Sequence, residues 1–402
     1  MEPGKNKPEP LLFEDNIFHL DLHPSNDIVV TGMINGRIKC YQYGLEGHKH
    51  LWTSKTFKKS CRGVSFSLDG KNVFGISRDR SIQILDTETG QAIRTRQNTH
   101  ESPINSLLII NENMSATGDD QGVIKIWDSR KDEAVMIYTE HEDYISQMTY
   151  SYSNKTLIAV GGDGYLSTWD IRKPDVVAMS DQMEDELLSI ALMKVNKSKV
   201  ERIATINSIA KNDKKAVVGT QEGVLTLWSW GDWGDYNDRI IGHPNSIDAI
   251  CKLDEDTICT GSSDGLIRLV GILPNQFHGI LGDHGENMPI ENLKLSHDKK
   301  YLVSSGHDDK LQFWDVAHLF QEDPGKEEDN DTTDDNEQVK PIVPSLEKTD
   351  VKDDGNDDDD DSWGTDSDEE TTKQKKRKKT QKKEARKPKK KNTKTAAFFA
   401  DM

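Results

Sequence analysis

One short pattern recurs seven times between residues 32 and 315 of this 402-residue chain. Its clearest copy, Gly118–Asp128, passes from small residues through a polar turn into an apolar run that ends in Trp-Asp. In every copy a polar turn residue lies six positions before a bulky closing residue. The turn residues are Asn35, Asp79, Gln121, Asp163, Glu222, Asp264 and Asp308, so successive copies are 44, 42, 42, 59, 42 and 44 residues apart. Such a period indicates a fold built from one repeated supersecondary unit.

This period is that of the WD40 repeat, whose units form the four-stranded blades of a β-propeller. The apolar run 114–118 predicts a buried strand, and the Gln-Gly pair that follows predicts a tight turn into the next strand. Seven copies predict an all-β fold, a seven-bladed WD40 propeller over residues 11–320, after a flexible segment of residues 1–10. Residues 11–13 are apolar, and no strand pattern follows Asp315. We therefore expect residues 11–13 to form the outer strand of the last blade and to close the ring.

Several copies open with a histidine, and the last copy alone keeps a full polar set. We predict a structural hydrogen-bonded tetrad in that copy, because buried polar groups require partners. Its members are His284, Ser304 (with Ser305 as the alternative), Asp308 and Trp314. A catalytic triad is not expected, because fragments of the set recur at the same phase of the repeat, whereas a triad is a unique site.

The net charge of −18 is unevenly distributed. Residues 321–370 hold 22 acidic residues and 4 lysines (−18), and residues 371–402 hold 14 basic and 2 acidic residues (+12), which leaves −12 for residues 1–320. Both tail blocks contain too few apolar residues to offset chain entropy, so we predict a disordered acidic linker followed by a basic targeting tail. The average charge argues against nucleic-acid contact, but the distribution provides a local site for it.

The tail contains three candidate functional features. A basic array predicts nuclear and nucleolar targeting with electrostatic RNA contact, against the alternative of a solvated charge run. Its members are Lys375, Lys376, Arg377, Lys378, Lys379, Lys382 and Lys383. The acidic block either binds basic proteins, masks the basic array or serves only solubility. Ser367 precedes Asp-Glu-Glu and is a candidate phosphosite for an acidophilic kinase.

The long 59-residue interval predicts an insertion between the fourth and fifth units. Lys197, Lys199 and Arg202 make this loop a candidate RNA or partner contact, against the alternative of a loop without a ligand. Just beyond it, Trp230 and Trp233 follow the closing Trp228 in a glycine-containing loop. Packing against the insertion is the preferred explanation for these two tryptophans, and anchoring of a partner is the alternative.

Two successive copies end in Trp-Asp-x-Arg, at 127–130 and 169–172. This double box resembles that of propellers that serve as substrate receptors on a cullin-RING ubiquitin ligase adaptor. Asp128, Arg130, Asp170 and Arg172 are the candidate adaptor contacts, because an exposed arginine fork can bind a carboxylate through two hydrogen bonds.

Other classes of protein are not expected. No apolar run approaches the ~18 residues that span a bilayer. The cysteines (Cys40, Cys61, Cys251 and Cys259) lack zinc or disulfide spacing, which favours a reducing compartment. No phosphate-binding glycine loop or metal motif is present, so we expect no cofactor, no metal, no small-molecule substrate and no enzyme activity.

Four stretches carry a closer resemblance: Ser60–Gln91, Pro103–Lys131, Cys259–Pro274 and Leu295–Asp315. They resemble the WD repeat-containing protein 55 family and its fungal ribosome-biogenesis counterparts, over essentially all of residues 11–320. The resemblance implies a non-enzymatic scaffold of the nucleus and nucleolus, with shuttling to the cytoplasm left open. It implies a role in ribosomal RNA production and processing and in large-subunit assembly. The expected partners are pre-ribosomal proteins and pre-rRNA, bound by a monomer within larger complexes.

Overall fold

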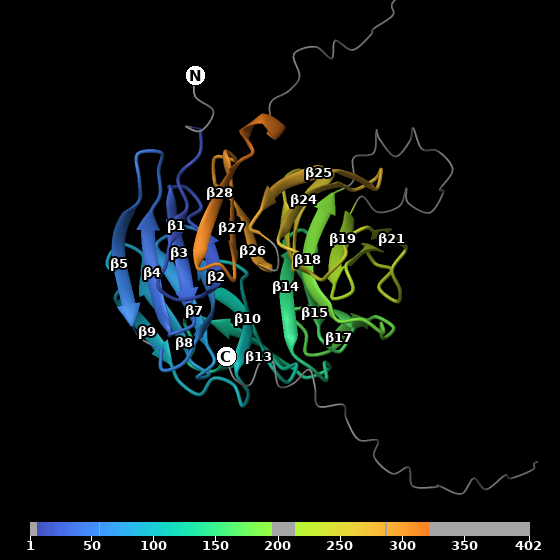
Figure 1. Ribbon diagram of the computed structural model, residues 1–402. Helices are drawn as coiled ribbons and strands as arrows, with labels where there is room; N and C mark the ends of the chain where they lie inside the picture. The colour runs from blue at the N-terminus through green and yellow to red at the C-terminus, as the bar shows by residue number, and fades with distance from the viewer. Residues whose placement is uncertain (1–5, 56, 195–213, 286–287, 321–402) are drawn as a thin grey trace, which may run out of the picture. The chain divides into compact units, whose positions relative to one another are not determined.

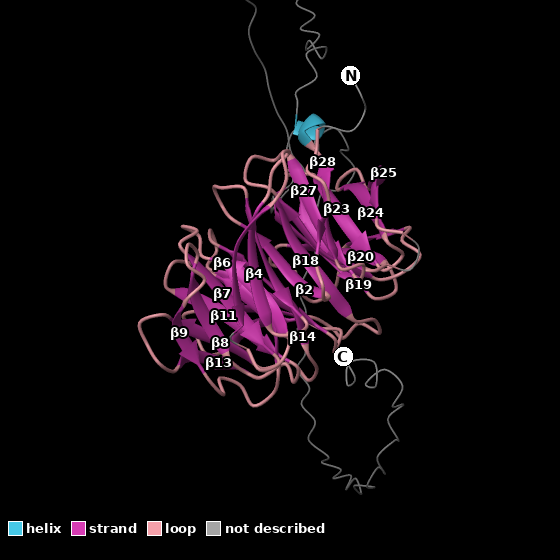
Figure 2. Cartoon of the chain, turned by 60° about the vertical axis from the view of Figure 1, so that its left-hand side comes forward, coloured by secondary structure: helices cyan, strands magenta, loops and turns pink. Residues whose placement is uncertain are grey.

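The computed structural model describes residues 6–55, 57–194, 214–285 and 288–320. These residues form seven four-stranded antiparallel sheets arranged as blades around a central axis (Figure 1). Strands account for nearly all the regular structure, and one short 3₁₀ helix, η2 (Ala317–Phe320), follows the last strand (Figure 2). The prediction of a seven-bladed propeller is confirmed.

In each blade the strands follow one another outward from the axis, so the first strand is the innermost. Blade 1 comprises β2 (Ile17–Leu22), β3 (Ile28–Met33), β4 (Arg37–Gln42) and β5 (Lys49–Lys55). Blade 2 comprises β6 (Cys61–Phe66), β7 (Asn72–Ser77), β8 (Ile82–Asp86) and β9 (Ala92–Arg96). Blade 3 comprises β10 (Ile104–Ile109), β11 (Met114–Asp119), β12 (Ile124–Asp128) and β13 (Ala134–Tyr138). Blade 4 comprises β14 (Ile145–Ser151), β15 (Thr156–Gly161), β16 (Leu166–Asp170) and β17 (Val176–Met179).

The remaining blades follow the same order, except that the last takes a strand from the other end of the chain. Blade 5 comprises β18 (Leu187–Lys194), β19 (Lys214–Thr220), β20 (Val224–Ser229) and β21 (Asp238–Ile241). Blade 6 comprises β22 (Ile247–Lys252), β23 (Thr257–Ser262), β24 (Leu266–Gly271) and β25 (Gln276–Asp283). Blade 7 comprises β26 (Ile290–Leu295), β27 (Tyr301–Gly306), β28 (Lys310–Asp315) and β1 (Leu11–Leu12).

The N-terminal strand closes the ring. β1 pairs antiparallel with β28, with Leu11 opposite Leu311, and the Phe13 N–H donates to the Asp309 carbonyl at 2.9 Å. Leu11 is buried in the cluster between blades 7 and 1, whereas Leu12 is 72% exposed. This strand covers the outer edge of β28, which would otherwise be open.

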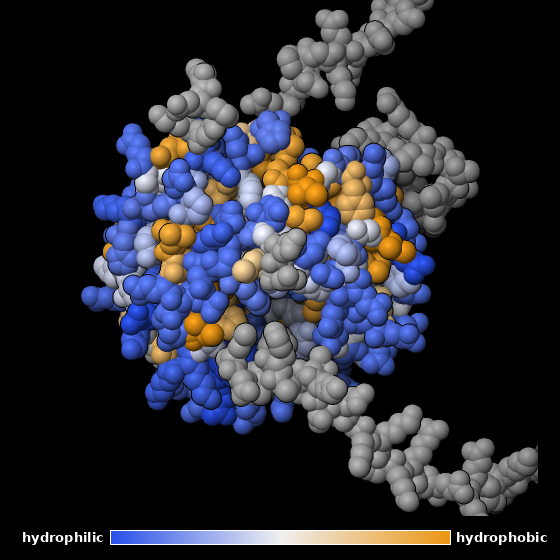
Figure 3. Space-filling model, in the orientation of Figure 1, coloured by the Kyte–Doolittle hydropathy of each residue, from blue (hydrophilic) through white to orange (hydrophobic). Residues whose placement is uncertain are grey.

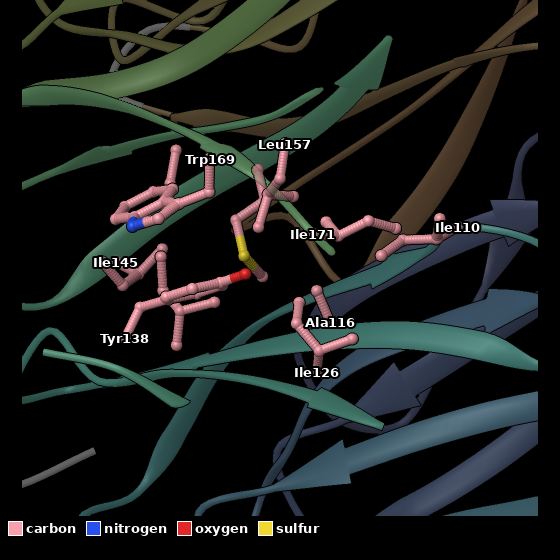
Figure 4. Close-up of a cluster of buried hydrophobic side chains, with 11 residues drawn as sticks. Ile110, Ala116, Ile126, Tyr138, Ile145, Leu157, Trp169 and Ile171 are labelled. Atoms are coloured by element: carbon pink, nitrogen blue, oxygen red, sulfur yellow. The ribbon is translucent and has the colours of Figure 1, made fainter. Parts of the chain in front are cut away.

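Apolar side chains fill the seams between neighbouring blades. Figure 4 shows the cluster between blades 3 and 4, where Tyr138 stacks on Trp169 with ring centroids 5.1 Å apart. Such an aromatic pair contributes about 0.5–1.5 kcal/mol beyond its buried area.

The seam between blades 2 and 3 is divided into two smaller clusters. Arginines of the outer strand β9 reinforce it: the Arg96 guanidinium donates to the Asp128 carbonyl at 3.0 Å and lies 5.3 Å from the centre of the Trp127 ring. Arg94 donates to the Ser129 carbonyl and pairs with Asp132. Polar contacts therefore replace part of the apolar packing in this seam.

The insertion within the 59-residue interval lies at a different place in the repeat from the one predicted. Residues 195–213 connect β18 to β19, so the insertion lies within blade 5 and not between two units. The repeat copies mark the second and third strands, and the sequence pattern did not show that the first strand of blade 5 precedes the insertion. Lys215, near the start of β19, is only 3% exposed and donates to Ser229 Oγ at 2.6 Å.

The three closely spaced tryptophans pack inward. Trp228 and Trp233 belong to the buried cluster between blades 4 and 5, and Trp230 packs against the same cluster. Trp230 meets Trp233 edge to face, with ring centroids 5.2 Å apart. They therefore form part of the seam and do not offer an exposed aromatic anchor.

Candidate functional site

The four predicted tetrad residues of blade 7 form one hydrogen-bonded chain. His284 Nδ1 lies 2.8 Å from Asp308 Oδ2, and His284 Nε2 lies 2.6 Å from Ser304 Oγ. The indole N–H of Trp314 donates to the same Ser304 oxygen at 2.8 Å. Burial raises the pKa of Asp308, but hydrogen bonds and charge from His284 and Lys310 outweigh it and leave this pKa below its usual value.

Blade 3 contains a second complete tetrad, so the prediction that the last copy alone keeps the full set is wrong. His100 lies 2.9 Å from Asp119 and 2.8 Å from Thr117 Oγ1, and Trp127 donates to Thr117 at 2.8 Å. Threonine replaces serine here, and the aspartate ends strand β11 instead of standing in the turn. Both substitutions preserve the hydrogen-bonding chemistry but change the residue pattern.

Other blades keep parts of the chain. In blade 4, His141 binds Asp163 and Ser167, and the buried Trp169 indole nitrogen has no partner among the described residues. In blade 6, Asp264 forms an ion pair with Arg268, at a shortest distance of 2.6 Å, and not with the histidine. His243 is hydrogen-bonded only to Thr260 among the described residues. The same polar chain recurs in graded form around the ring, which is the behaviour of a structural element and not of one active site.

The two Trp-Asp-x-Arg boxes lie in equivalent turns of blades 3 and 4. Arg130 places Nε 2.9 Å from Asp128 Oδ1 and Nη2 2.7 Å from Oδ2. Arg172 binds Asp170 in the same way, at 2.7 and 2.5 Å. The hydrogen bonds from Arg172 hold the pKa of Asp170 at about 2. Both arginines are largely exposed (72% and 61% of the side chain), but each already uses its fork on its own aspartate. A partner can therefore reach only the remaining guanidinium edge.

The seven inner strands enclose a polar cavity of about 360 Å³. Every inner strand carries a β-bulge between its first and third residues. A bulge changes the direction of a side chain, and six of the seven bulged residues line the cavity: Arg62, Asn105, Ser146, Leu188, Asp248 and Glu291. The bulges thus give the channel its polar lining.

Ion pairs link neighbouring blades beside this channel. Arg62 pairs with Asp120 at 2.8 Å, and Lys294 with Asp21 at 3.2 Å. Burial, together with the nearby charge of Glu291, raises the pKa of Asp248 to about 6. Glu291 in turn lies 2.7 Å from His307. Within the described part of the chain, no group of three or more His, Cys, Asp or Glu side chains could hold a metal ion.

Known proteins match this propeller along its whole length. The family model WDR55 matches residues 8–319. WD repeat-containing protein 55 of Rattus norvegicus is 38% identical over 317 residues, which cover 78% of this chain and 78% of that protein. The Arabidopsis thaliana protein of the same name is 38% identical over 308 residues, covering 76% of this chain and 82% of its own. WD repeat-containing protein JIP5 of Coprinopsis cinerea is 36% identical over 318 residues, covering 76% and 73%.

The chain belongs to the WD repeat-containing protein 55 family. The matched span includes β1 and all seven blades, so the family relationship applies to the closed ring. Several candidate residues lie outside the described residues. They are Lys197, Lys199 and Arg202 of the insertion, the basic array Lys375, Lys376, Arg377, Lys378, Lys379, Lys382 and Lys383, and the candidate phosphosite Ser367. The acidic and basic tail blocks also lie outside the described residues.

On this member of the WD repeat-containing protein 55 family, the structure assembles one basic surface that the repeat pattern did not reveal. We call it the basic patch, and its residues are Arg37, Lys55, Lys58, Lys59, Arg78 and Arg80. They come from two blades and from three separate stretches of sequence. The repeat phase could have revealed them, because all six lie at or beside the ends of strands on one side of the ring. Summing charge along segments of the sequence, and not over one face of the ring, concealed these six residues.

Most of the coloured surface in Figure 3 is hydrophilic, and the hydrophobic residues on this side form separate patches. Among the described residues, no helix is both long and apolar enough to cross a membrane.

Proposed function

We propose that this propeller is a non-enzymatic scaffold in nucleolar ribosome biogenesis, in ribosomal RNA production and processing and in large-subunit assembly. The match to the WD repeat-containing protein 55 family over residues 8–319 is the observation that carries the proposal. Pre-ribosomal proteins and pre-rRNA are the proposed partners, and nucleus and nucleolus are the proposed location. The cation-rich residues 371–402 support this choice, because phosphate affinity comes from clustered lysine and arginine.

The geometry suits a scaffold for a physical reason. Ring closure by β1 and the polar chains of blades 3 and 7 hold the strands rigid, so the loops at both faces are presented in a fixed arrangement. The His, Ser and Asp side chains of the described propeller serve that rigidity as repeated units. This supports the proposal that the chain carries out no catalysis.

Density-gradient sedimentation of a cell extract tests the proposal. The tagged full chain should sediment with pre-ribosomal particles and should be enriched in the nucleolus. A full-length variant with Lys375, Lys376, Arg377, Lys378 and Lys379 changed to glutamine should lose most of that enrichment. A variant with Lys71, Lys131 and Lys173 changed to glutamine loses three positive charges on exposed propeller turns and should behave as the parent chain. Free sedimentation of the parent chain would contradict the proposal.

A second candidate function is that of a substrate receptor on a cullin-RING ubiquitin ligase adaptor. The observation that favours it is the equivalent, exposed placement of Arg130 and Arg172 in neighbouring blades. Changing both to alanine should abolish co-precipitation of the adaptor. Changing Lys131 and Lys173 to alanine, in the same two turns, is the matched control. Retention of the adaptor by the arginine variant, or its absence from the parent chain, would exclude this function.

A further inference from the structure

The two faces of the propeller differ in charge. Strand direction alternates within a blade, so the first and third connections of each blade open on one face and the second connection opens on the other. We call the latter the turn face, and it also receives the connections between blades. Between residues 97 and 309, the described connections of the turn face contain 14 acidic residues and not one lysine or arginine. The acidic residues are Glu101, Asp120, Glu140, Glu142, Asp143, Asp163, Asp181, Glu184, Asp185, Glu186, Glu222, Asp264, Asp308 and Asp309.

The basic patch interrupts this acidic face at blades 1 and 2. Its three stretches contact one another directly, because the Arg78 N–H donates to the Ser60 carbonyl at 3.0 Å and the Lys58 N–H donates to Asp79 Oδ2 at 2.8 Å. Arg37 and Lys55 are paired across β4 and β5. The turn of blade 1 closes the set, since a Cβ on Gly36 would lie 2.4 Å from the Lys59 carbonyl oxygen. The six cations therefore form one continuous surface.

The positive charges of Arg80 and of the three lysines are not neutralised within the patch. Asp79 is the single acidic residue of residues 34–37, 55–60 and 78–81, and it accepts hydrogen bonds from backbone and from Ser81. Arg80 donates to neutral acceptors, the Glu101 carbonyl and the Asn98 side chain, both at 3.3 Å. Lys55, Lys58 and Lys59 are exposed and form no ion pair with any described residue. Like charges held together in this way favour binding of an external anion.

We propose that the basic patch binds the phosphate backbone of single-stranded RNA. The choice of RNA rests on the proposed function, and the chemistry of the patch supports phosphate contact without base recognition. Its one aromatic residue, Phe57, is buried at 4% exposure, so the patch offers no described aromatic side chain on which a base can stack. Protein interfaces are organised around an exposed apolar centre, and no large hydrophobic side chain of the patch's described residues is exposed. Lysine ammonium groups on a polar surface suit phosphate, which they contact as point charges.

The surrounding carboxylates give the bound strand a position. Repulsion from the acidic connections of blades 3–7 acts over about 8–10 Å at physiological ionic strength. Toward the channel, Arg62 is neutralised by Asp120, so the patch ends there. An RNA strand is therefore confined to blades 1 and 2, and the rest of the turn face stays free of nucleic acid.

Anisotropy titrations of the full chain with a fluorescein-labelled 20-nucleotide oligouridylate, over a range of NaCl concentrations, test the proposal. The test variant changes Lys55, Lys58 and Lys59 to glutamine. The matched control changes Lys71, Lys131 and Lys173 to glutamine, which are exposed lysines of the opposite face. Because the tail cations also attract RNA, both sets are compared in a full chain whose Lys375, Lys376, Arg377, Lys378 and Lys379 are glutamine as well.

The test variant should bind about 10- to 100-fold more weakly near 0.1 M salt, and its slope of log K against log salt should fall by about 2, at ~0.7 for each lost phosphate contact. The control should stay within about twofold of its parent. Changing Glu101 to glutamine should increase affinity, because this exposed acidic residue lies beside Arg80 at the edge of the patch and its repulsion is removed.

Two results would overturn the proposal. One is equal affinity and equal slope for the test and control variants. The other is polyglutamate binding as tightly as oligouridylate with the same dependence on the three lysines, which would assign the patch to an acidic protein. Purified components are used, so a negative titration leaves the sedimentation test of the proposed function unaffected. Conversely, loss of particle association by the parent chain counts against that function and not against the patch.

Discussion

Ala159 and Ser167 are paired across β15 and β16, and the hydroxyl lies on the opposite strand from the one used in blades 3 and 7. In those blades Thr117 and Ser304 supply it from the second strand and serve both the histidine and the tryptophan. Ser167 reaches His141 from the third strand at 2.5 Å, and the Trp169 indole N–H is left without a partner among the described residues. Blade 4 thus satisfies one end of its polar chain at the expense of the other.

We predict that the double change Ala159→Ser and Ser167→Ala stabilises the propeller by about 1 kcal/mol, because one serine would then serve both His141 and Trp169. Ser167→Ala alone should destabilise it by about 1–3 kcal/mol, since His141 Nε2 loses its buried partner. Urea denaturation measures both. A double variant that is no more stable than the parent chain would contradict this prediction.

Ring closure predicts a sharp contrast between two adjacent leucines. Leu11→Ala should lower the free energy of unfolding by about 2–4 kcal/mol, because Leu11 is buried between blades 7 and 1. Leu12→Ala should change it by less than about 0.5 kcal/mol, because that side chain is 72% exposed. Deletion of residues 1–14 should lower the melting temperature further. Similar values for the two alanine variants would mean that β1 does not hold the ring.

The blade 7 tetrad predicts loss of stability in acid. Burial raises the pKa of Asp308, but its hydrogen bonds and ion pairs lower it by more, so this pKa lies below its ordinary value near 3.8. The folded state therefore favours the charged carboxylate, so this contribution is present above about pH 4 and is lost as pH falls through the depressed pKa. Asp308→Asn should flatten the pH dependence of the melting temperature below pH 4. An unchanged acid limb would contradict the assignment.

Asp248 predicts the opposite dependence. Burial is the main cause that raises the pKa of Asp248 to about 6, and the charge of Glu291 adds to it. The folded state therefore favours the protonated acid, so Asp248 lowers the free energy of unfolding as pH rises from about 4 to 6. Asp248→Asn should therefore stabilise the protein by about 1–2 kcal/mol at pH 7.5 and have little effect near pH 4. Chemical denaturation at the two pH values provides the comparison, and an equal effect at both would rule out the raised pKa of Asp248 as the cause.

The arginine contacts between blades 2 and 3 predict that the stability of the propeller depends on Arg96. Arg96→Met keeps an unbranched chain beside Trp127 but removes the hydrogen bond to the Asp128 carbonyl. We expect a loss of about 1.5–3 kcal/mol. Arg239→Met, on the exposed outer strand of blade 5, is the control and should have little effect. Thermal unfolding compares the two, and equal losses would show that Arg96 has no special role.

Much of the fold was predictable because the determinants are local. The turn residue and the closing bulky residue are six positions apart within one hairpin, so each copy specifies its own strands. The blade 3 tetrad was missed because Thr117 and Asp119 preserve its chemistry with different residues. The insertion was misplaced because its position depends on where the first strand of blade 5 pairs, at Lys194 opposite Lys214, which no local pattern records.

The sequence by itself determined the number of blades and the opposed charge of the two tail blocks, because each depends on residues close together in the chain. It also predicted the closing strand, although β1 pairs with β28 at the other end of the chain, because residues 11–13 are apolar and no strand pattern follows Asp315. Only the tertiary structure decided which charges share a face. Arg37, Lys58 and Arg80 become neighbours because blades 1 and 2 pack side by side, although strands of both blades separate these residues in the sequence. The structure likewise showed that Arg130 and Arg172 are already bound to their own aspartates, since side-chain geometry and not sequence spacing determines whether a donor is free.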